Sequence, residues 1–345
     1  MAPETIPIIY QDHHLLIVNK PAGLVIHPTY KHADGTMWDA LLVHLAQQGS
    51  DDWQPPELPD EPEWARAPLY IQEMLRARRT ERQWKEDGLL PRPCLLHRLD
   101  KDTSGIVALA RTERSRRHLI RQFHEHTIVK RYLAVVHKGA PDWSYPRTRF
   151  TVTKRENGKD EVLTGIPPSL LCSAPIQAAN EASASCESPP GSLAYGQAAC
   201  KENNELILDG PLQRDPVDRR RCIVGPDGQV ATTILKVLAV SEGEKFALLE
   251  VQPVTGRTHQ IRAHLAALGY AIVGDQVYAP PAEQGTSQAA LKRQFLHACS
   301  LELRRYPDNS LCTFAAPLAG DLASWMKSYF PMGLGVIDAS STVPA

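Results

Sequence analysis

The sequence predicts an α+β fold, and three observations support this class. Short apolar runs bounded by Gly, Pro, Asn or Asp recur along the chain, as is typical of β-strands. Longer stretches place apolar residues at helical spacing, with polar residues between them. The hydrophobic fraction of 43% is that of a globular protein, and no apolar run approaches the roughly 18 residues that a membrane span requires. These patterns do not specify the order of the strands.

The predicted strands share a high content of aliphatic residues between turn residues. They are residues 6–10, 15–18, 94–96, 106–110, 130–136, 230–240, 245–251, 296–303 and 312–315. The predicted helices share an apolar stripe at helical spacing. They are residues 35–45, 112–126, 258–269 and 321–330. Thr36 and Thr258 are placed to cap the first and the third of these helices, and Gly269 is placed to end the third.

Two stretches lack this periodicity. Residues 51–92 are first rich in Pro and acid and then alternate Arg and Glu, whereas residues 142–205 are dominated by Pro, Ser, Ala, Gly and Asn. We predict that both are surface insertions and that the second is mostly disordered. We therefore expect a single domain over residues 1–330, interrupted by the two insertions and followed by a loose tail at 331–345.

Charge is distributed unevenly along the chain. Residues 51–63 hold six acids and no base, and residues 160–209 hold seven acids against Lys201 alone, so each stretch carries −6. Because the whole chain carries −1, the remainder carries +11. A remainder of this charge could bind a polyanion such as a nucleic acid.

The seven cysteines do not indicate a disulfide framework, because their number is odd and none forms a Cys-x-x-Cys pair. We expect reduced thiols and no zinc site built from cysteines. The first 14 residues lack the basic start and the apolar centre of a signal peptide. We therefore expect a soluble, cytoplasmic protein.

The most informative stretch is residues 94–110, where a polar turn separates two apolar runs. Asp100 lies in this turn beside cationic residues, and Thr-Ser-Gly follows shortly after it. A carboxylate at the end of a buried strand is well placed to act as a reactive acid against a rigid sheet. An ordinary turn, in which the Asp side chains bond their own backbone, fits the same pattern. The residues alone leave both interpretations open.

The predicted helix at 258–269 carries a polar face of its own. Ile261, Leu265 and Leu268 recur toward the core, which turns Arg262 onto another face. The cationic or titratable residues around it are Arg257, His259 and His264. Such surroundings favour an anion or a carboxylate as the partner of Arg262, although a solvated face is the plainer alternative.

Five segments, taken together, carry a resemblance to a known family. They are Asp12 to Gly23, His97 to Gly105, Lys130 to Val136, Gly256 to Leu265 with Val273 to Asp275, and Leu296 to Ala298. In type and order they resemble the characteristic segments of the RluA-type pseudouridine synthases, which isomerise uridine in structured RNA. The resemblance covers most of the chain outside the two predicted insertions.

This resemblance implies an α+β domain with a mixed, mainly antiparallel sheet, flanking helices and a central RNA-binding cleft. It implies that Asp100 is the catalytic aspartate, that Tyr132 stacks on the target base and that Arg262 pairs with the aspartate. It also implies that Arg98 helps to fill the gap left by the flipped nucleotide. The further substrate-binding residues in the matching segments are His97, Thr103, Arg257, His259 and Leu296.

The implied reaction breaks the N1–C1′ bond of uridine, turns the uracil and rejoins it through C5. It needs a carboxylate that acts on the sugar or on the base, and Asp100 is the candidate. An adjacent guanidinium holds such a carboxylate ionised and aimed. The sequence permits attack on ribose C1′ or on uracil C6, and we favour C1′. Asp102 is assigned to turn chemistry. We expect no metal ion and no cofactor, because the reaction is redox-neutral and the chain has no nucleotide-binding loop or zinc pattern.

The resemblance also implies a partner. We expect rRNA or tRNA to be bound, with no DNA and no membrane, by a protein that is a monomer. The sequence departs from the family in three respects. We expect no S4-like RNA-binding module before Asp12, the two insertions are long, and the second separates the Tyr132 strand from residues 208–212, which lie close behind it in relatives. These departures concern RNA contacts and substrate choice rather than the chemistry.

Two other function classes fit parts of the sequence. The segment from Asp100 to Thr103 superficially resembles the aspartyl-phosphate motif of magnesium-dependent phosphotransferases and phosphatases, although polar residues interrupt the strand before it. The charge distribution would also permit a non-catalytic RNA-binding module. The presence of Tyr132 and Arg262 together with Asp100 argues against that module.

Overall fold

The computed structural model describes residues 6–26, 35–46, 87–137, 151–156, 158–163, 205–241, 245–279 and 291–330. Its strands are β1 (Ile8–Gln11), β2 (Leu15–Lys20), β3 (Leu89–Leu95), β4 (Ser104–Thr112), β5 (Val129–His137), β6 (Thr151–Glu156), β7 (Lys159–Leu163), β8 (Glu205–Asp209), β9 (Leu212–Arg214), β10 (Cys222–Val224), β11 (Thr232–Val240), β12 (Phe246–Pro253), β13 (Leu296–Arg304) and β14 (Leu311–Ala315). Its helices are α1 (Met37–Ala46), α3 (Glu113–His124), α4 (Gln260–Ala267) and α5 (Gly320–Tyr329). No helix in these ranges is long and apolar enough to cross a membrane.

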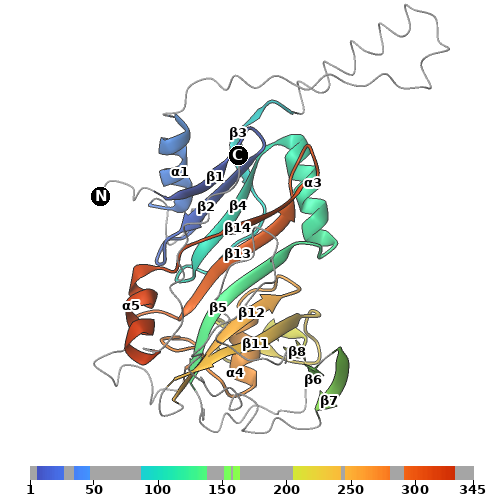
Figure 1. Ribbon diagram of the computed structural model, residues 1–345, viewed down its shortest axis with the longest axis vertical. Coiled ribbons are helices and arrows are strands. Elements are labelled where there is room, and N and C mark those ends of the chain that lie inside the picture. Colours follow the sequence, from blue (N-terminus) through green and yellow to red (C-terminus); the bar gives the residue numbers. More distant parts are fainter. Residues whose placement is uncertain are drawn as a thin grey trace, which may run out of the picture.

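One large sheet organises the described chain. Its strands follow the order β1-β2-β4-β13-β5-β12-β11-β8-β6-β7, with β14 beside β13 and β3 beside β4, while β9 and β10 pair separately. Among the described strands, all pairs are antiparallel except that of β4 with β13. The sheet extends through the length of Figure 1, from β1 and β2 at one end to β6 and β7 at the other. The predicted mixed, mainly antiparallel sheet is confirmed.

The parallel pair lies at the centre of the sheet and brings distant segments together. His297 is in register with Ser104, and Ala298 with Gly105. Gly105 has φ of 116°, and a Cβ atom there would lie 2.2 Å from the carbonyl oxygen of Ala298, so glycine is required for this approach. On its other side, Ala298 is in register with Tyr132. The polar turn before β4 therefore lies one strand away from Tyr132.

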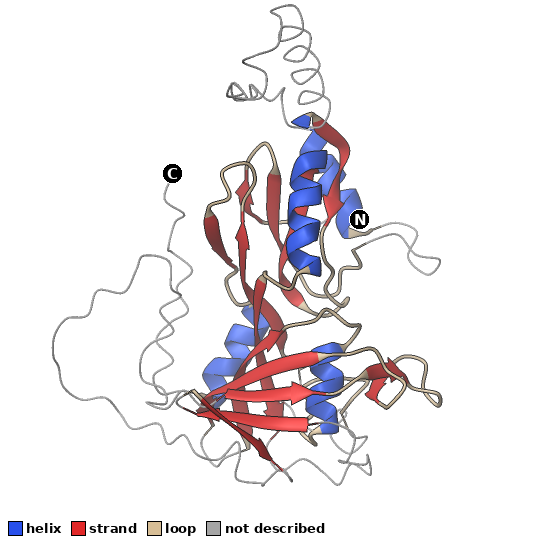
Figure 2. Cartoon of the chain, turned by 90° about the vertical axis from the view of Figure 1, so that its right-hand side faces the viewer, coloured by secondary structure: helices blue, strands red, loops and turns tan. Residues whose placement is uncertain are grey.

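The core explains the apolar runs in the sequence. All nine residues of β4 are buried, as are five of the six in β2, because both faces of these strands are covered. In α3, Leu119 is buried, Arg117 and Arg121 are exposed, and Arg114 and Arg116 are half-buried. Thr112 caps that helix, since its Oγ1 accepts the N–H of Ser115. Figure 2 shows helices beside the strands in both halves of the molecule.

The predicted insertions contain regular structure where they are described. β3 begins at Leu89, inside the first predicted insertion. β6 and β7 form a hairpin that pairs with β8 and extends the sheet, so the prediction of disorder is wrong for these two strands. They lie at the sheet edge, and their sequences, Thr-Val-Thr-Lys-Arg-Glu and Lys-Asp-Glu-Val-Leu, are too polar to show a buried face. The rest of both insertions and the tail at 331–345 lie outside the described residues.

Helix α4 begins at Gln260, two residues later than predicted, and Thr258 does not cap it. The N-cap is His259, which has left-handed backbone angles (φ 55°, ψ 19°) and makes no side-chain capping bond. The buried side chain of Gln260 secures the preceding loop instead. Its Oε1 accepts hydrogen bonds from Thr255 Oγ1 (2.8 Å) and from the Arg257 backbone N–H (2.9 Å). Gln260, which lies inside the helix, therefore fixes the start of α4 in place of the cap expected at Thr258.

Candidate active site

A cavity of about 590 Å³ lies where β3, β5, β13 and the start of α4 meet. Its size is within the roughly 300 to 1,000 Å³ typical of ligand pockets. All nine residues predicted for the site line it. They are Asp100, Tyr132, Arg262, Arg98, His97, Thr103, Arg257, His259 and Leu296. The structure thus brings together residues from four separate segments of the sequence.

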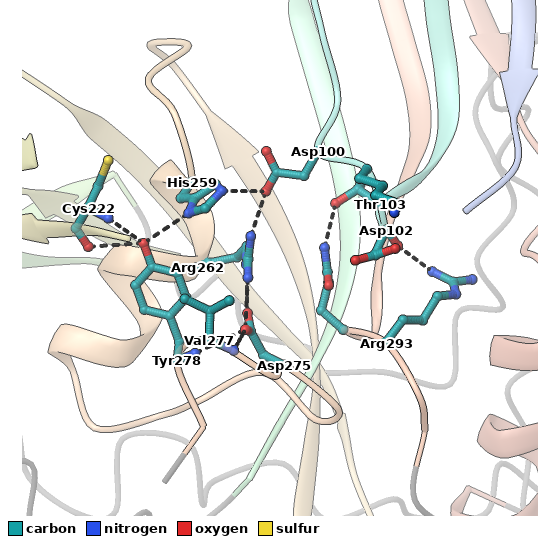
Figure 3. Close-up of polar contacts among 12 residues, drawn as sticks. Asp100, Asp102, Thr103, Cys222, His259, Arg262, Asp275, Val277, Tyr278 and Arg293 are labelled. Atoms are coloured by element: carbon teal, nitrogen blue, oxygen red, sulfur yellow. Dashed lines mark hydrogen bonds and ion pairs between the residues drawn. The ribbon is translucent and has the colours of Figure 1, made fainter. Parts of the chain in front are cut away.

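Asp100 and Arg262 are paired at the wall of this cavity (Figure 3). Arg262 Nη1 donates to Asp100 Oδ2 at 3.0 Å. The other edge of the guanidinium is held by Asp275, with Nε to Oδ2 at 2.7 Å and Nη2 to Oδ1 at 2.9 Å. Asp275 is fully buried, and its Oδ1 also accepts the backbone N–H groups of Val277 and Tyr278. Arg262 is therefore fixed by a buried carboxylate and presents one N–H to Asp100.

The guanidinium of Arg262 stays charged in this setting. Its Cζ lies 5.0 Å from the centroid of the Tyr278 ring, in the range of a cation–π contact. Burial lowers the pKa of Arg262, but the carboxylates of Asp275 and Asp100 outweigh that effect and raise it overall. A charge-assisted hydrogen bond from such a group fixes where Oδ2 of Asp100 lies.

Strand β5 supplies Tyr132 and Lys130, which are two residues apart and so lie on the same face of the strand. The Tyr132 side chain is 8% exposed, and burial, followed by the charge of Asp100, raises its pKa, so the phenol is neutral. Burial lowers the pKa of Lys130 to about 8, and its Nζ donates to the carbonyl of Thr255 at 3.4 Å. An aromatic side chain beside a cation suits a planar base on a phosphate backbone.

The turn that carries Asp100 is held from inside the protein by Lys20, whose side chain is fully buried. Its Nζ donates to the carbonyl oxygens of Pro21, Lys101 and Thr103, each at 2.9 Å. Three N–H donors thus meet three acceptors. The carbonyls of Lys101 and Thr103 lie one and three residues after Asp100. The ammonium group therefore fixes the backbone that positions the carboxylate.

We expect Lys20→Met to lower the free energy of unfolding by about 3 kcal/mol, because three buried carbonyls each lose a donor at about 1 kcal/mol or more. Urea unfolding measures this change. Lys101→Met is the matched control, because Lys101 is an exposed lysine of the same turn, and it should unfold as the wild type does. Equal unfolding midpoints for the two variants would contradict the role given to Lys20.

The same lysine predicts a pH dependence of stability. Burial lowers the pKa of Lys20 from 10.5 to about 7, and the charges of Asp102 and Asp100 oppose this only in part. Between these pH values the unfolded chain holds a proton that the folded protein has released, so the contribution of Lys20 to the free energy of unfolding rises with pH. The difference in this free energy, wild type minus Lys20→Met, should therefore grow from about pH 7 to about pH 9. A constant difference would contradict the lowered pKa.

A second network supports the turn from the side of α5. Arg293 bonds Asp321 through Nε (2.6 Å) and Nη2 (2.8 Å), and donates to the Asp102 carbonyl (3.1 Å) and to Ser104 Oγ (3.3 Å). Ser104 Oγ lies 2.9 Å from His297 Nδ1. Asp102 therefore contributes its backbone carbonyl to the support of the turn, which agrees with the turn role predicted for it (Figure 3).

Three predicted substrate-binding residues lie at the cavity with different exposure. Arg98 and Arg257 are exposed, and Arg257 Nε donates to the Val230 carbonyl at 3.1 Å. Leu296 is buried and forms part of the cavity wall. Two exposed guanidinium groups beside a cavity suit contacts with a polyanion.

His97 and Thr103 also line the cavity, and one polar side-chain atom of each is bonded within the protein. His97 Nε2 accepts the N–H of Ala108 at 3.1 Å, and its ring stacks on Phe123 with centroids 5.3 Å apart. Burial, with a smaller contribution from the charge of Lys130, lowers the pKa of His97 to about 3, so it is neutral. Thr103 Oγ1 accepts a hydrogen bond from Gln294 at 3.2 Å. Both residues shape the wall, and a contact with substrate remains a prediction.

The expectation that His264 adds to the surroundings of Arg262 is wrong. His264 is buried, with Nδ1 2.9 Å from Thr233 Oγ1 and Nε2 2.9 Å from the Gly210 carbonyl. Two residues along a helix point to different faces, so the ring turns toward β11 rather than toward the cavity. His264 has a structural role.

Four residues that support the site by hydrogen bonds had no role predicted from the sequence. They are Lys20, Asp275, Tyr278 and Arg293. Lys20 carried a signal, because it alternates with Val18 on a strand whose neighbours are apolar. Asp275 lay inside a matching segment, but nothing in the 13-residue spacing linked it to Arg262. Arg293 gave no signal, because its contacts with the turn join residues that are 189 and 191 positions apart.

The arrangement offers one carboxylate, a fixed cation, an imidazole and a neutral aromatic side chain around one cavity. The described partners of Asp100 are Arg262 and His259, rather than a second carboxylate. In the described ranges, no three His, Cys, Asp or Glu side chains are grouped so as to hold a metal ion. The set suits attack by, or proton transfer to, an aspartate that a guanidinium holds in place. It gives no support to a magnesium-dependent phosphotransferase.

Sequence comparison shows which known proteins this chain is similar to. The family model for RNA pseudouridylate synthase matches residues 14–267. Ribosomal large subunit pseudouridine synthase D of Nitrosomonas europaea is 28% identical over 94% of this chain and 66% of its own length. An uncharacterized RNA pseudouridine synthase of Chloroflexus aurantiacus is 32% identical over 88% of this chain and 63% of its own length. The solved structure of human RNA Pseudouridylate Synthase Domain Containing 1 has a TM-score of 0.48 and 18% identity, with 92% of this chain and 85% of that chain covered.

The chain spans just under two thirds of the length of these two curated relatives. The family match covers more than half of the chain and includes Asp100, Tyr132 and Arg262. It follows that the chain belongs to the RNA pseudouridylate synthase family.

Proposed function

We propose that this protein converts uridine to pseudouridine in structured RNA, with Asp100 as the reacting carboxylate. The observation that supports this most strongly is the hydrogen bond from Arg262 to Asp100 in a cavity that Tyr132 also lines. The guanidinium is fixed by Asp275 before any substrate arrives, so no reorganisation is needed at the moment of reaction. Such preorganisation is expected of an enzyme site rather than of a binding module.

The proposed reaction requires the target nucleotide to leave its helix, because Asp100 cannot reach a stacked base. Flipping costs a few kcal/mol. Stacking on Tyr132 returns about 1 to 3 kcal/mol. Asp100 then attacks the nucleotide, for which we favour ribose C1′ over uracil C6. As Asp100 bonds to C1′, the N1–C1′ bond breaks; the uracil then turns, and its C5 displaces the Asp100 carboxylate as the C5–C1′ bond forms. One proton leaves C5 and one joins N1, so the isomerisation is balanced.

We further propose that the RNA is ribosomal. This rests on the names of relatives such as the ribosomal large subunit pseudouridine synthases D of Nitrosomonas europaea and Xanthomonas campestris pv. campestris, which are each 28% identical to this chain. The exposed guanidinium groups of Arg98 and Arg257 at the cavity would contact the phosphates. Uridine as substrate favours RNA over DNA. Action on ribosomal RNA would place the protein in the cytoplasm, and we propose that it acts there as a monomer.

The product can be identified directly. Large-subunit rRNA transcribed in vitro is incubated with the protein, digested to nucleosides and separated by chromatography. We expect pseudouridine to appear with wild-type protein. Carbodiimide-dependent primer extension on cellular rRNA, with and without the gene, then locates the position. Absence of pseudouridine from both rRNA and tRNA substrates would overturn the proposed function, and its appearance only in tRNA would overturn the ribosomal target.

A further inference from the structure

His259 lies beside Asp100, and its protonation pattern can be assigned from its neighbours. Tyr278 Oη lies 3.0 Å from the Cys222 carbonyl, 2.7 Å from the Cys222 backbone N–H and 3.2 Å from His259 Nδ1. A carbonyl only accepts, so the single hydroxyl proton of Tyr278 goes to it. His259 Nδ1 must then carry a proton and donate it to Tyr278 Oη. This assignment follows from hydrogen-bond accounting.

The tautomer has a direct consequence for the cavity. With the proton on Nδ1, the neutral ring carries its lone pair on Nε2. That nitrogen lies 3.7 Å from Asp100 Oδ2 (Figure 3). Nε2 and Oδ2 are then two neighbouring acceptors at the cavity, where each can take a proton or a hydrogen bond from a bound group. The Tyr278 hydroxyl holds the ring in this orientation. That hydroxyl donates to the Cys222 carbonyl and accepts the Cys222 backbone N–H.

The backbone of His259 reinforces this placement. Its φ of 55° is unusual for a residue other than glycine, and it makes no capping bond that would explain the conformation structurally. Strained backbone of this kind is often found where a side chain is held for a function. The effect here is to aim the imidazole at the cavity, where its side chain is 18% exposed, rather than along the helix.

The proposed isomerisation needs a base at one defined point. After C5 has bonded to C1′, C5 still carries its hydrogen, and a base must remove it. At that moment C5 is attached to the same C1′ at which Asp100 acts, so the base must lie within reach of Asp100. Two nearby groups on β5 are unsuited: Tyr132 is a neutral phenol whose pKa burial raises, and Lys130 has a pKa of about 8 and is largely protonated at neutral pH. Among the histidines that line the cavity, His259 is the one that the structure places against Asp100. The unprotonated Nε2 of His259 meets the requirement.

We propose that His259 is the base that removes the C5 proton of the rearranged uracil, an inference that rests on the proposed function. The C5–H bond breaks and the proton passes to Nε2. The electron pair restores the C5–C6 double bond, the N1–C6 π pair moves to N1, and N1 takes a proton from solvent. The imidazolium returns the proton to solvent. The groups that face His259 are Asp100, Arg262, Asp275, Arg98 and Tyr278. Burial and the two arginines lower the pKa of His259 and outweigh the carboxylates, which keeps the ring neutral before the step.

The test uses His259→Asn. This substitution removes the proposed base and leaves the other residues of the site unchanged. Asparagine tolerates left-handed backbone angles, and its side-chain amide can donate to Tyr278 Oη in place of Nδ1–H. It has no atom at the position of Nε2. In large-subunit rRNA transcripts labelled with tritium at uridine C5, we expect single-turnover tritium release to fall by about 10²- to 10⁴-fold. A deuterium isotope effect at C5 should appear in the variant.

A second substrate separates this step from the earlier ones. In 5-fluorouridine RNA the C5 position carries no proton, so the reaction up to C5–C1′ bond formation needs no base. The loss of N-linked 5-fluorouridine should therefore proceed at nearly the same rate in wild type and in His259→Asn. Loss of both reactions in the variant would overturn the inference, because His259 would then act earlier or hold the fold. Retention of tritium release would also overturn it and would leave Asp100 as its own base. Failure of the wild type to release tritium would instead refute the proposed function.

Discussion

An Asp100→Asn variant is expected to fold and to bind RNA as the wild type does, while single-turnover conversion of uridine falls by roughly 10⁴-fold or more. The reason is that the amide keeps the shape of the carboxylate, and its oxygen can still accept the Arg262 N–H, but it is not a nucleophile. Arg262 keeps its bidentate partner Asp275, so no buried charge loses its counterion. Rapid-quench conversion and filter binding measure the two quantities separately.

Asp102→Asn is the matched control for this experiment. Asp102 belongs to the same turn, and it supports the turn through its backbone carbonyl, which the substitution leaves in place. We expect conversion to change by no more than about 3-fold, as for a side chain outside the cavity lining. If both variants lost conversion equally, the effect would be due to the charge or the shape of the turn, and not to Asp100 as the reacting group.

Arg262→Met is expected to lose both catalysis and stability. Asp275 is fully buried and would be left without its cation, which costs about 3 to 5 kcal/mol. Asp100 would also lose the N–H that fixes its Oδ2. The sequence analysis gave Arg262 only Asp100 as a partner, by resemblance, and the second partner, Asp275, could not be seen there. Chemical denaturation and single-turnover kinetics measure the two losses.

A companion variant separates these two roles. Combining Arg262→Met with Asp275→Asn removes the unpaired buried charge, while the amide oxygen can still accept the N–H groups of Val277 and Tyr278. We expect this double variant to regain most of the stability lost by the single variant and to remain inactive. Recovery of catalysis in the double variant would show that the guanidinium is needed only to neutralise Asp275.

The sequence predicts the centre of the site better than its supports. Asp100 lies between two apolar runs, which made it a candidate beside the reading as an ordinary turn, and the resemblance assigned it the catalytic role. The pairing of Arg262 with Asp100 came from the resemblance, since the two residues are 162 positions apart. Asp275 could not be connected to either, because a carboxylate in a loop after a helix has many possible partners. Burial, which makes the Arg262–Asp275 pair strong, appears only in three dimensions.

For the fold, too, the buried centre was predicted from the sequence and the edge was not. The buried strands β2, β4 and β5 were predicted, because both of their faces are apolar and the runs are continuous. The hairpin of β6 and β7 was missed, because an edge hairpin with polar side chains resembles a loop in sequence. The parallel pairing of β4 with β13 joins Ser104 to His297, and no local pattern reports such a contact. It is this pairing, with the requirement for glycine at 105, that places the turn beside Tyr132.

The central claim is that Asp100, held by Arg262, carries out the isomerisation of uridine in the cavity that Tyr132 lines. The most direct measurement is the release of tritium from rRNA labelled at uridine C5, because formation of the C5–C1′ bond expels that hydrogen. Wild-type protein should release tritium in proportion to pseudouridine formed, and Asp100→Asn should release none above background while binding the same RNA equally well. Release by Asp100→Asn at the wild-type rate would contradict the claim.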